Sequence, residues 1–355
     1  MYSDSENLPP KRSSGSLKQR RVQIPWPADQ VFRILSIDGG GIRGIYPATF
    51  LAGLEDRYLG GGSVAPYFDL IAGTSTGGVI AIGLAAGLKA TELRDLYINR
   101  GCEIFPPTRS GVIGAMERCS REFCRYLKFR YNRKALMHIL HESFGNRKFG
   151  EAQTRLCIPS FEGRHSEVYI FKTPHHPDFW KDASEQMTKV AAATAAAPTF
   201  FEPLQDGGYI FVDGGVWANN PIMIALVDAL SCFSVPRERV QILSLGCGDE
   251  PYVVDRPKIR RGGMLAWRKV IDAAMRLQSL NALGQAGLLI GADRIIRASA
   301  PTSEDTIQMD DWTRAVSELP SAAESTLNRR GANVAKVFLS KPANRYVPIV
   351  TKPLV

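Results

Sequence analysis

Residues 32–44 read Phe32-Arg-Ile-Leu-Ser-Ile-Asp-Gly-Gly-Gly-Ile-Arg-Gly44, a short apolar run that ends in a glycine-rich turn. The apolar run predicts a buried strand, because it is short and is followed at once by turn residues. Apolar residues at helical spacing over 46–58 predict a helix directly behind the turn. A strand, a glycine-rich turn and a helix in this order form the repeating unit of an α/β protein.

The same alternation of strands and helices continues along the chain. Further strands are predicted at 67–72, 168–171, 209–212 and 240–245, and further helices after Gly77 and at 133–144, 186–196 and 222–230. This alternation predicts an α/β fold, a three-layer α/β/α sandwich with a mostly parallel sheet covered on both faces. In such sheets, binding and catalytic sites form at the carboxyl ends of the strands.

Composition divides the chain into three regions. Residues 1–30 combine basic residues with serine and glycine, which predicts a flexible basic tail and not a secretory signal. Residues 31–250 are predicted to form the main domain, with a cap-like insertion around 100–133 where the alternation stops. Residues 251–355 predict a helical extension packed on the same domain. Because no apolar stretch is long enough to span a bilayer, we expect a soluble, cytoplasmic protein.

The balance of charge favours an anionic partner. The chain carries 44 Lys and Arg against 35 Asp and Glu, a net charge of +9, which suits a membrane surface or a nucleotide. Two basic clusters fit either such a partner or ordinary solvated faces: Arg118, Arg121, Arg125 and Lys128, and Arg256, Lys258, Arg260, Arg261, Arg268 and Lys269. No nucleic-acid-binding motif is present, so nucleic acid is not an expected partner. The cysteines lack the spacing of a zinc site, so we expect reduced thiols and no metal.

The second glycine-rich turn, Gly73-Thr-Ser75-Thr-Gly77, has the pattern of a nucleophile elbow. A sharp strand-to-helix turn exposes the serine oxygen, and Gly73 and Gly77 flank it because side chains there would collide. The motif alone is weak, and its alternative is a plain turn with Ser75 as a helix N-cap. The buried strand before it and the small-residue helix after it favour Ser75 as a catalytic nucleophile.

A serine hydroxyl needs a base, and the sequence favours aspartate over histidine for that role. All five histidines (His138, His141, His165, His175 and His176) precede Asp213, so the order of an α/β-hydrolase triad cannot be met with Asp213 as its acid. Asp213 follows the strand predicted at 209–212 and opens Asp213-Gly-Gly215, where no bulky neighbour blocks a close approach. We therefore expect Asp213 to act as proton acceptor for Ser75.

The first glycine-rich turn is expected to stabilise an oxyanion. Gly39, Gly40 and Gly41 precede a helix N-terminus, where successive N–H groups can converge on a negative charge, and Arg43 adds a cation. The spacing Gly39-x-Gly41-x-x-Gly44 also matches a dinucleotide-binding fingerprint. That reading needs an acidic residue at the end of a second strand, and Glu55 and Asp56 fall within the predicted helix instead.

Together these motifs resemble those of the patatin-like phospholipases. The matching stretches are Asp38–Gly44, Gly73–Gly77 and Asp213–Gly215, and residues 192–201 resemble a further family segment. The resemblance covers roughly residues 30 to 250. It implies an α/β/α sandwich and hydrolysis of lipid acyl esters by a Ser–Asp dyad without histidine or metal, with Ser75 as nucleophile and Asp213 as base.

Within that family, the chain is similar to bacterial CapV-type phospholipases of antiphage (CBASS) systems. This resemblance implies activation by a cyclic dinucleotide and transient contact with membrane phospholipid at the inner face of the membrane. No residue identifies a cyclic-dinucleotide site, so a constitutive lipid acyl-hydrolase or esterase without nucleotide control stays the alternative. The sequence leaves head group, acyl position and a homo-oligomeric state open.

Overall fold

The computed structural model describes residues 9–11, 20–107, 129–248, 270–301 and 305–349, and these form a mixed sheet between two layers of helices. Most of the predicted tail, the centre of the predicted insertion and both basic clusters lie outside the described residues. The strands are β1 (Phe32–Ile37), β2 (Leu70–Gly73), β3 (Arg155–Glu162), β4 (Glu167–Lys172), β5 (Leu204–Asp206), β6 (Tyr209–Asp213), β7 (Val240–Gly246) and β8 (Ile295–Ser299). Their order is β5-β6-β3-β2-β1-β7-β8, with β4 paired to β3.

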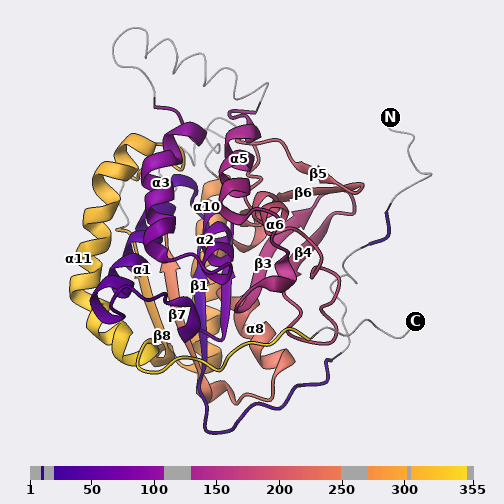
Figure 1. Ribbon diagram of the computed structural model, residues 1–355, viewed down its shortest axis with the longest axis vertical. Coiled ribbons are helices and arrows are strands. Elements are labelled where there is room, and N and C mark those ends of the chain that lie inside the picture. The colour runs from indigo at the N-terminus through magenta and orange to yellow at the C-terminus, as the bar shows by residue number, and fades with distance from the viewer. Residues whose placement is uncertain (1–8, 12–19, 108–128, 249–269, 302–304, 350–355) are drawn as a thin grey trace, which may run out of the picture.

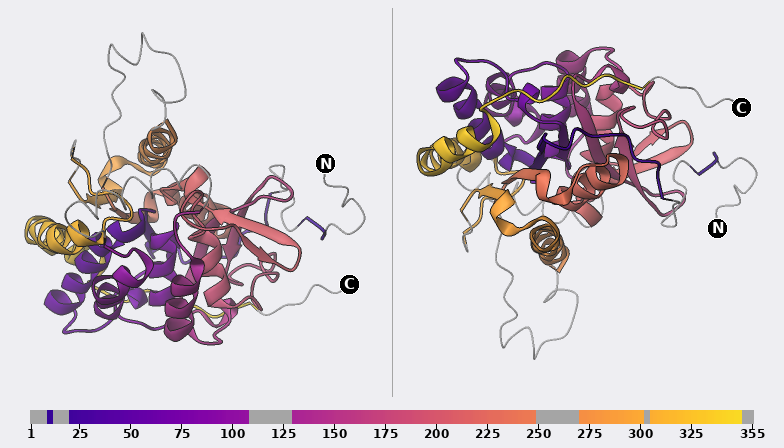
Figure 2. Two further views of the ribbon diagram at one scale, coloured as in Figure 1. Left: turned by 90° about the horizontal axis from the view of Figure 1, so that it is seen from above. Right: turned by 90° about the horizontal axis from the view of Figure 1, so that it is seen from below.

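The helices pack on the two faces of this sheet, as the view from below in Figure 2 shows. One face is covered by α1 (Ile45–Tyr58), α2 (Thr76–Ala85), α3 (Ala90–Ile104), α5 (Arg133–Phe144), α6 (Met187–Thr194) and α11 (Trp312–Phe338). The other face is covered by α8 (Ile222–Cys232) and α10 (Val270–Ile290), and the short α7 (Gly215–Ala218) precedes α8. The described helices include none with the length and hydropathy to cross a bilayer. The three-layer fold is confirmed.

Alternation along the strands supplies both cores. In β1, Phe32 and Ile34 pack under α8, whereas Leu35 and Ile37 pack under α1 and α2. All four side chains are fully buried, which agrees with the continuous apolar run expected of a strand covered on both faces. The central strand and its two parallel neighbours, β2 and β7, therefore form a rigid base for the turns at their carboxyl ends.

Two features of the sheet differ from the prediction. Strands β4 and β6 both run antiparallel to β3, a strand that was not predicted because Pro159 interrupts its apolar run. The C-terminal region, expected to be helical, also contributes β8, which pairs parallel to β7 at the edge of the sheet. The C-terminal region thus extends the sheet itself and is more than a helical appendage.

Candidate active site

Ser75 lies in a strained turn between β2 and α2. Its φ of 54° and ψ of −122° are rarely adopted by a residue with a side chain. The turn is tight on both sides of the serine, since a Cβ at Gly73 would lie 2.1 Å from Gly77 O, and one at Gly77 would lie 2.3 Å from Ile37 O. Only glycine fits at either position, as a nucleophile elbow requires.

A threonine that the sequence analysis did not single out holds this turn. The backbone N–H of Ser75 donates to Thr194 Oγ1 at 3.0 Å, and the Thr194 hydroxyl donates to Pro159 O at 2.6 Å. Thr194 is fully buried at the end of α6. It belongs to the 192–201 segment of the family resemblance, and its polar side chain among alanines was the available signal.

Ser75 and Asp213 are in direct contact. Ser75 Oγ lies 2.6 Å from Asp213 Oδ2, and the other carboxylate oxygen accepts the N–H of Gly215 at 2.6 Å. Burial raises the pKa of Asp213 to about 6, against the opposing effect of these two hydrogen bonds. A carboxylate with this pKa is a stronger base than an exposed one and is still largely ionised at neutral pH.

The arrangement of three strands explains this contact. Cys157 of β3 pairs with Ala72 of β2 on one edge and with Lys172 of β4 on the other. Further along, Ser160 pairs with Tyr169 of β4, so its pairing with Asp213 of β6 uses the edge that β2 occupies. β2 and β6 therefore approach each other along one edge of β3, and their carboxyl ends meet. The contact between Ser75 and Asp213 follows from this close approach of the two strand ends.

The glycine-rich turn after β1 lies against the serine. A Cβ at Gly39 would lie 3.3 Å from Ser75 Cβ and 2.5 Å from Asn219 Oδ1. The N–H of Gly39 already donates to Asn219 O at 3.0 Å, and that of Ile42 donates to Met309 O at 2.9 Å. Of the predicted oxyanion residues, Gly40 and Gly41 are therefore the better candidates to donate an N–H to a bound oxyanion.

The glycine-rich turn, the elbow and the aspartate form one site in a fold whose sequence matches a known family. The model described as patatin-like phospholipase matches residues 35–226. The chain belongs to the patatin-like phospholipase family. A cGAMP-activated phospholipase of Pseudomonas aeruginosa is 35% identical over 322 residues, which cover 88% of this chain and 90% of that protein. Shorter alignments link the chain to a second bacterial relative and a plant one.

A cGAMP-activated phospholipase of Escherichia coli is 36% identical over 233 residues, covering 62% of this chain and 63% of that protein. Patatin-like protein 2 of Arabidopsis thaliana is 34% identical over 271 residues, covering 66% of this chain and 64% of that protein. The chain thus spans just under two thirds of the length of these two relatives. These matches confirm the resemblance to the patatin-like phospholipases. They give no support to the alternative that Gly39-x-Gly41-x-x-Gly44 is the fingerprint of a dinucleotide-binding fold.

Arg43 of this patatin-like chain supports the turn from its outer side. Its Nε donates to Gly40 O at 3.3 Å. The side chain also lines a cavity of about 320 Å³ between the turn and the C-terminal region, together with Cys247, Thr306 and Arg314. Arg314 forms ion pairs with Asp305 and Glu318 at the same cavity. Arg43 therefore reaches the oxyanion region through Gly40 O, and no described contact joins it to Ser75 or Asp213.

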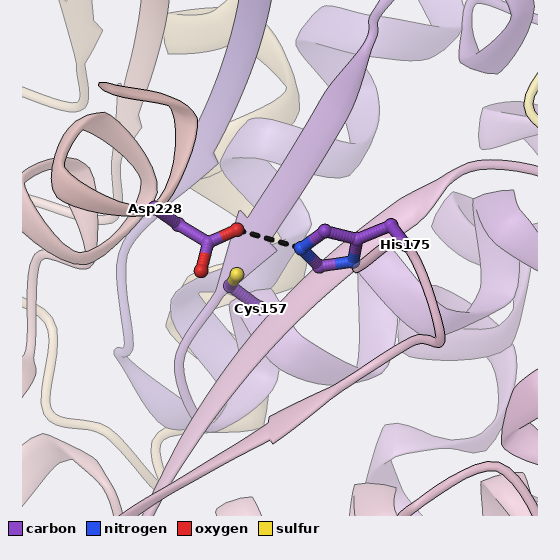
Figure 3. Close-up of side chains that lie close together, drawn as sticks. All are labelled: Cys157, His175 and Asp228. Atoms are coloured by element: carbon purple, nitrogen blue, oxygen red, sulfur yellow. Dashed lines mark hydrogen bonds and ion pairs between the residues drawn. The ribbon is translucent and has the colours of Figure 1, made fainter. Parts of the chain in front are cut away.

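The side-chain contacts of the histidines in the described part of the chain lie away from the dyad. His138 lies 3.5 Å from Glu142, His165 Nδ1 lies 2.7 Å from Glu162, and His176 Nε2 donates to Val22 O. His175 Nε2 donates to Asp228 at 2.7 Å, within a fully buried cluster that also contains Cys157 (Figure 3). Among the described residues, none of these contacts joins a histidine to Ser75.

The buried cluster has the donor atoms of a metal site but the charges of an ion pair. Sulfur, nitrogen and oxygen atoms of Cys157, His175 and Asp228 lie within 4.8 Å of one another. Burial alone would raise the pKa of Asp228, but Lys172 and His175 beside it lower that pKa well below its usual range. Burial raises the pKa of the Cys157 thiol. A protonated thiol and a carboxylate paired with Lys172 favour a structural role for this cluster.

Proposed function

We propose that this chain hydrolyses acyl esters of membrane phospholipids, with Ser75 as nucleophile and Asp213 as its base. The observation that carries the proposal is the 2.6 Å contact between Ser75 Oγ and Asp213 Oδ2 within a nucleophile elbow. Membership of the patatin-like phospholipase family supports a phospholipid as the substrate. No cofactor is needed for this chemistry, because the nucleophile, the base and the oxyanion donors all belong to the protein.

The proposed reaction passes through an acyl-enzyme. Asp213 Oδ2 takes the Ser75 proton as Oγ attacks the ester carbonyl carbon, and the N–H groups of Gly40 and Gly41 donate to the oxyanion. The intermediate collapses as Asp213 returns the proton to the leaving lysophospholipid oxygen. Water, deprotonated by Asp213, then attacks the acyl carbon, and the released Ser75 Oγ recovers a proton. Products are a fatty acid and a lysophospholipid.

We propose further that a cyclic dinucleotide activates the enzyme. Support comes from the bacterial relatives named as cGAMP-activated phospholipases, one of which aligns over 90% of its length. The cavity beside Arg43 is a candidate binding site for this ligand, because a phosphate held there would lie next to the glycine-rich turn. A ligand acts in this way only if it binds the catalytically ordered turn more tightly than other conformations.

Contact with the membrane is the third part of the proposal, and the outer face of α10 is its candidate surface. Leu277, Leu280, Leu288 and Leu289 are exposed there, Leu288 by 89%. The sequence between Arg276 and Asp293 carries no charge. On its inner side α10 packs against α7, and just after α7 the backbone N–H of Asn220 donates to Gln278 Oε1 at 3.1 Å. An apolar surface one helix away from the dyad suits an enzyme that draws its substrate from the inner face of a bilayer.

The test is release of fatty acid from phospholipid vesicles by the purified full-length chain. Reactions should be run without ligand and with each member of a cyclic-dinucleotide panel that includes cGAMP. Hydrolysis that appears or rises strongly with one ligand, together with a higher melting temperature, supports the whole proposal. Full hydrolysis without ligand leaves a constitutive acyl-hydrolase. No hydrolysis of any acyl ester under any of these conditions contradicts the proposed activity.

A further inference from the structure

Asp38 anchors the start of the glycine-rich turn through a bidentate ion pair with Arg297. Arg297 Nη1 donates to Asp38 Oδ1 at 2.9 Å, and Nη2 donates to Oδ2 at 2.5 Å. Ser279 of α10 donates its hydroxyl to Oδ2 at 3.3 Å. The Asp38 side chain is only 3% exposed, so this carboxylate depends on Arg297 to balance its charge. With both oxygens engaged in this way, Asp38 does not compete with Asp213 as a base.

Arg297 is itself held rigidly. Its Nη1 donates to Ser244 Oγ of β7 at 2.7 Å, and its backbone O accepts Nη1 of Arg330 of α11 at 2.8 Å. The guanidinium lies across Gly246, where a Cβ would be 2.4 Å from Nη2. The side chain therefore has little freedom to take another position, and neither does the carboxylate that it binds.

The backbone of the turn is fixed at the same place. Asp38 N–H donates to Leu245 O at 2.9 Å, and Asp38 O accepts the thiol of Cys247 at 3.4 Å. Four residues further on, Ile42 N–H donates to Met309 O at 2.9 Å. The candidate oxyanion donors Gly40 and Gly41 lie between these two anchors. Their positions relative to Ser75 depend on Asp38.

These anchors come from outside the part of the chain that matches the family model. That match ends at residue 226, whereas Ser244, Leu245, Cys247, Ser279, Arg297 and Met309 all follow it. The strand β8, which carries Arg297, is also one of the strands that the sequence pattern did not predict. The part of the chain that follows residue 226 therefore supports the catalytic turn, from β7, β8 and α10.

We propose that Arg297 is a positioning residue for ester hydrolysis, which holds the Gly40 and Gly41 N–H groups against the oxyanion through its bidentate pair with Asp38. The inference rests on the proposed function of the Ser75 site. Loss of the pair lets the turn shift, and misplacing oxyanion donors costs about 10²-fold in kcat. Substrate binding involves other surfaces, so KM changes little.

The experiment compares Arg297→Ala, Arg297→Lys and Asp38→Asn with the wild type in the full chain, with and without cGAMP. It measures kcat and KM on the water-soluble ester p-nitrophenyl butyrate, and the rate at which a fluorophosphonate labels Ser75. The phosphonyl oxygen occupies the oxyanion position, so labelling reports on the donors. Arg57→Ala, which removes an exposed pair with Glu324, is the matched control for loss of an arginine.

We expect Arg297→Ala to lose about 10²-fold in kcat and a similar factor in labelling, with KM within a few-fold. Methylguanidinium should restore part of the activity of Arg297→Ala and none to Ser75→Ala. Arg297→Lys keeps the charge but not the second hydrogen bond, and should lose about tenfold in kcat with a near-native melting temperature. If Arg297→Ala does not fold, the kcat of Arg297→Lys tests the role of Arg297 in its place.

Full kcat and full labelling in folded Arg297→Lys and Asp38→Asn would overturn the inference while leaving the proposed function intact. The same holds if KM alone rises. If the wild type itself neither turns over the ester nor is labelled at Ser75, the proposed function fails first. The two failures are therefore distinguishable from the same data.

Discussion

Asp213 of β6 lies directly opposite Ser160 of β3, three residues beyond Cys157, which pairs with Ala72 of β2. Because β2 and β6 share one edge of β3 and run toward each other, Ser75 and Asp213 meet where the two strands end. A short hydrogen bond between a strained serine and a buried aspartate results from backbone pairing. The dyad is therefore as rigid as the sheet that carries it.

The pKa of Asp213 predicts the pH dependence of activity. Burial raises this pKa to about 6, and only the ionised carboxylate can accept the Ser75 proton. We expect kcat/KM on a soluble ester to fall tenfold per pH unit well below pH 6 and to level off above about pH 7. A profile that levels off only above pH 8 would instead indicate a base with a higher pKa.

The same buried charge should cost stability. A carboxyl group whose pKa is raised on folding stabilises the fold when protonated, and that contribution is lost as pH rises through the folded pKa of about 6. At pH 7 Asp213→Asn should therefore abolish turnover yet raise the melting temperature, with a gain of up to about 3 kcal/mol. At pH 4 the gain should largely vanish. An unchanged or lower melting temperature at pH 7 would contradict this environment for Asp213.

Gly41 allows a matched test of the turn. Gly41 and Gly60 have nearly the same φ, +59° and +57°, but a Cβ at Gly41 would lie 2.3 Å from Met309 O, whereas nothing lies within 4 Å at Gly60. Gly60→Ala should cost about 1 kcal/mol of stability and leave activity unchanged. Gly41→Ala should cost clearly more and lower kcat by at least tenfold. Equal effects of the two substitutions on kcat would show that the turn does not shape the site.

Thr194 should matter to Ser75 through one hydrogen bond. Thr194→Val keeps the shape but removes the acceptor for the Ser75 N–H, 3.0 Å away, and should cost about 1–3 kcal/mol of stability and lower kcat. Thr194→Ser keeps the hydroxyl and should retain most of both. Thermal unfolding and ester turnover, both measured on Thr194→Val and on Thr194→Ser, show whether the hydrogen bond or the packing of Thr194 matters. Equal behaviour of the two variants would assign Thr194 to packing alone.

The motifs of the site could be predicted from the sequence, but not all the strands and contacts that hold these motifs in place. The strands that lead to Asp38, Ser75 and Asp213 were predicted, because each is an apolar run followed by glycine-rich turn residues. β3 was missed since Pro159 interrupts its pattern, and the antiparallel direction of β6 depends on which strand it pairs with. Local spacing carries no such information.

The support from the C-terminal region was hidden for a related reason. The pair between Asp38 and Arg297 joins residues 259 positions apart, and an isolated arginine in the short strand β8 has no local signature. Thr194 stood within a segment that was noticed, but its hydrogen bond to Ser75 depends on how α6 packs against the elbow. Contacts of this kind follow from the tertiary fold.

The apolar face of α10 predicts a split between soluble and membrane-bound substrates. Leu280→Asp with Leu288→Asp places charge on an exposed surface, so the fold should be retained. We expect vesicle binding and hydrolysis of vesicle phospholipid to fall at least tenfold, while turnover of p-nitrophenyl butyrate stays unchanged. Loss of self-association by ultracentrifugation with normal vesicle hydrolysis would instead assign this face to contact between two copies of the chain.

The most direct test of the account is to trap the acyl-enzyme and locate it. The wild type, activated by cGAMP if it requires a ligand, is mixed with an excess of a slowly hydrolysed p-nitrophenyl ester, acid-quenched and analysed by intact mass and peptide mapping. We predict a burst of one p-nitrophenol per active chain and an acyl group on Ser75, with neither in Ser75→Ala and almost none in Asp213→Ala. Normal turnover in folded Ser75→Ala, or an acyl group on a different residue, would contradict the account.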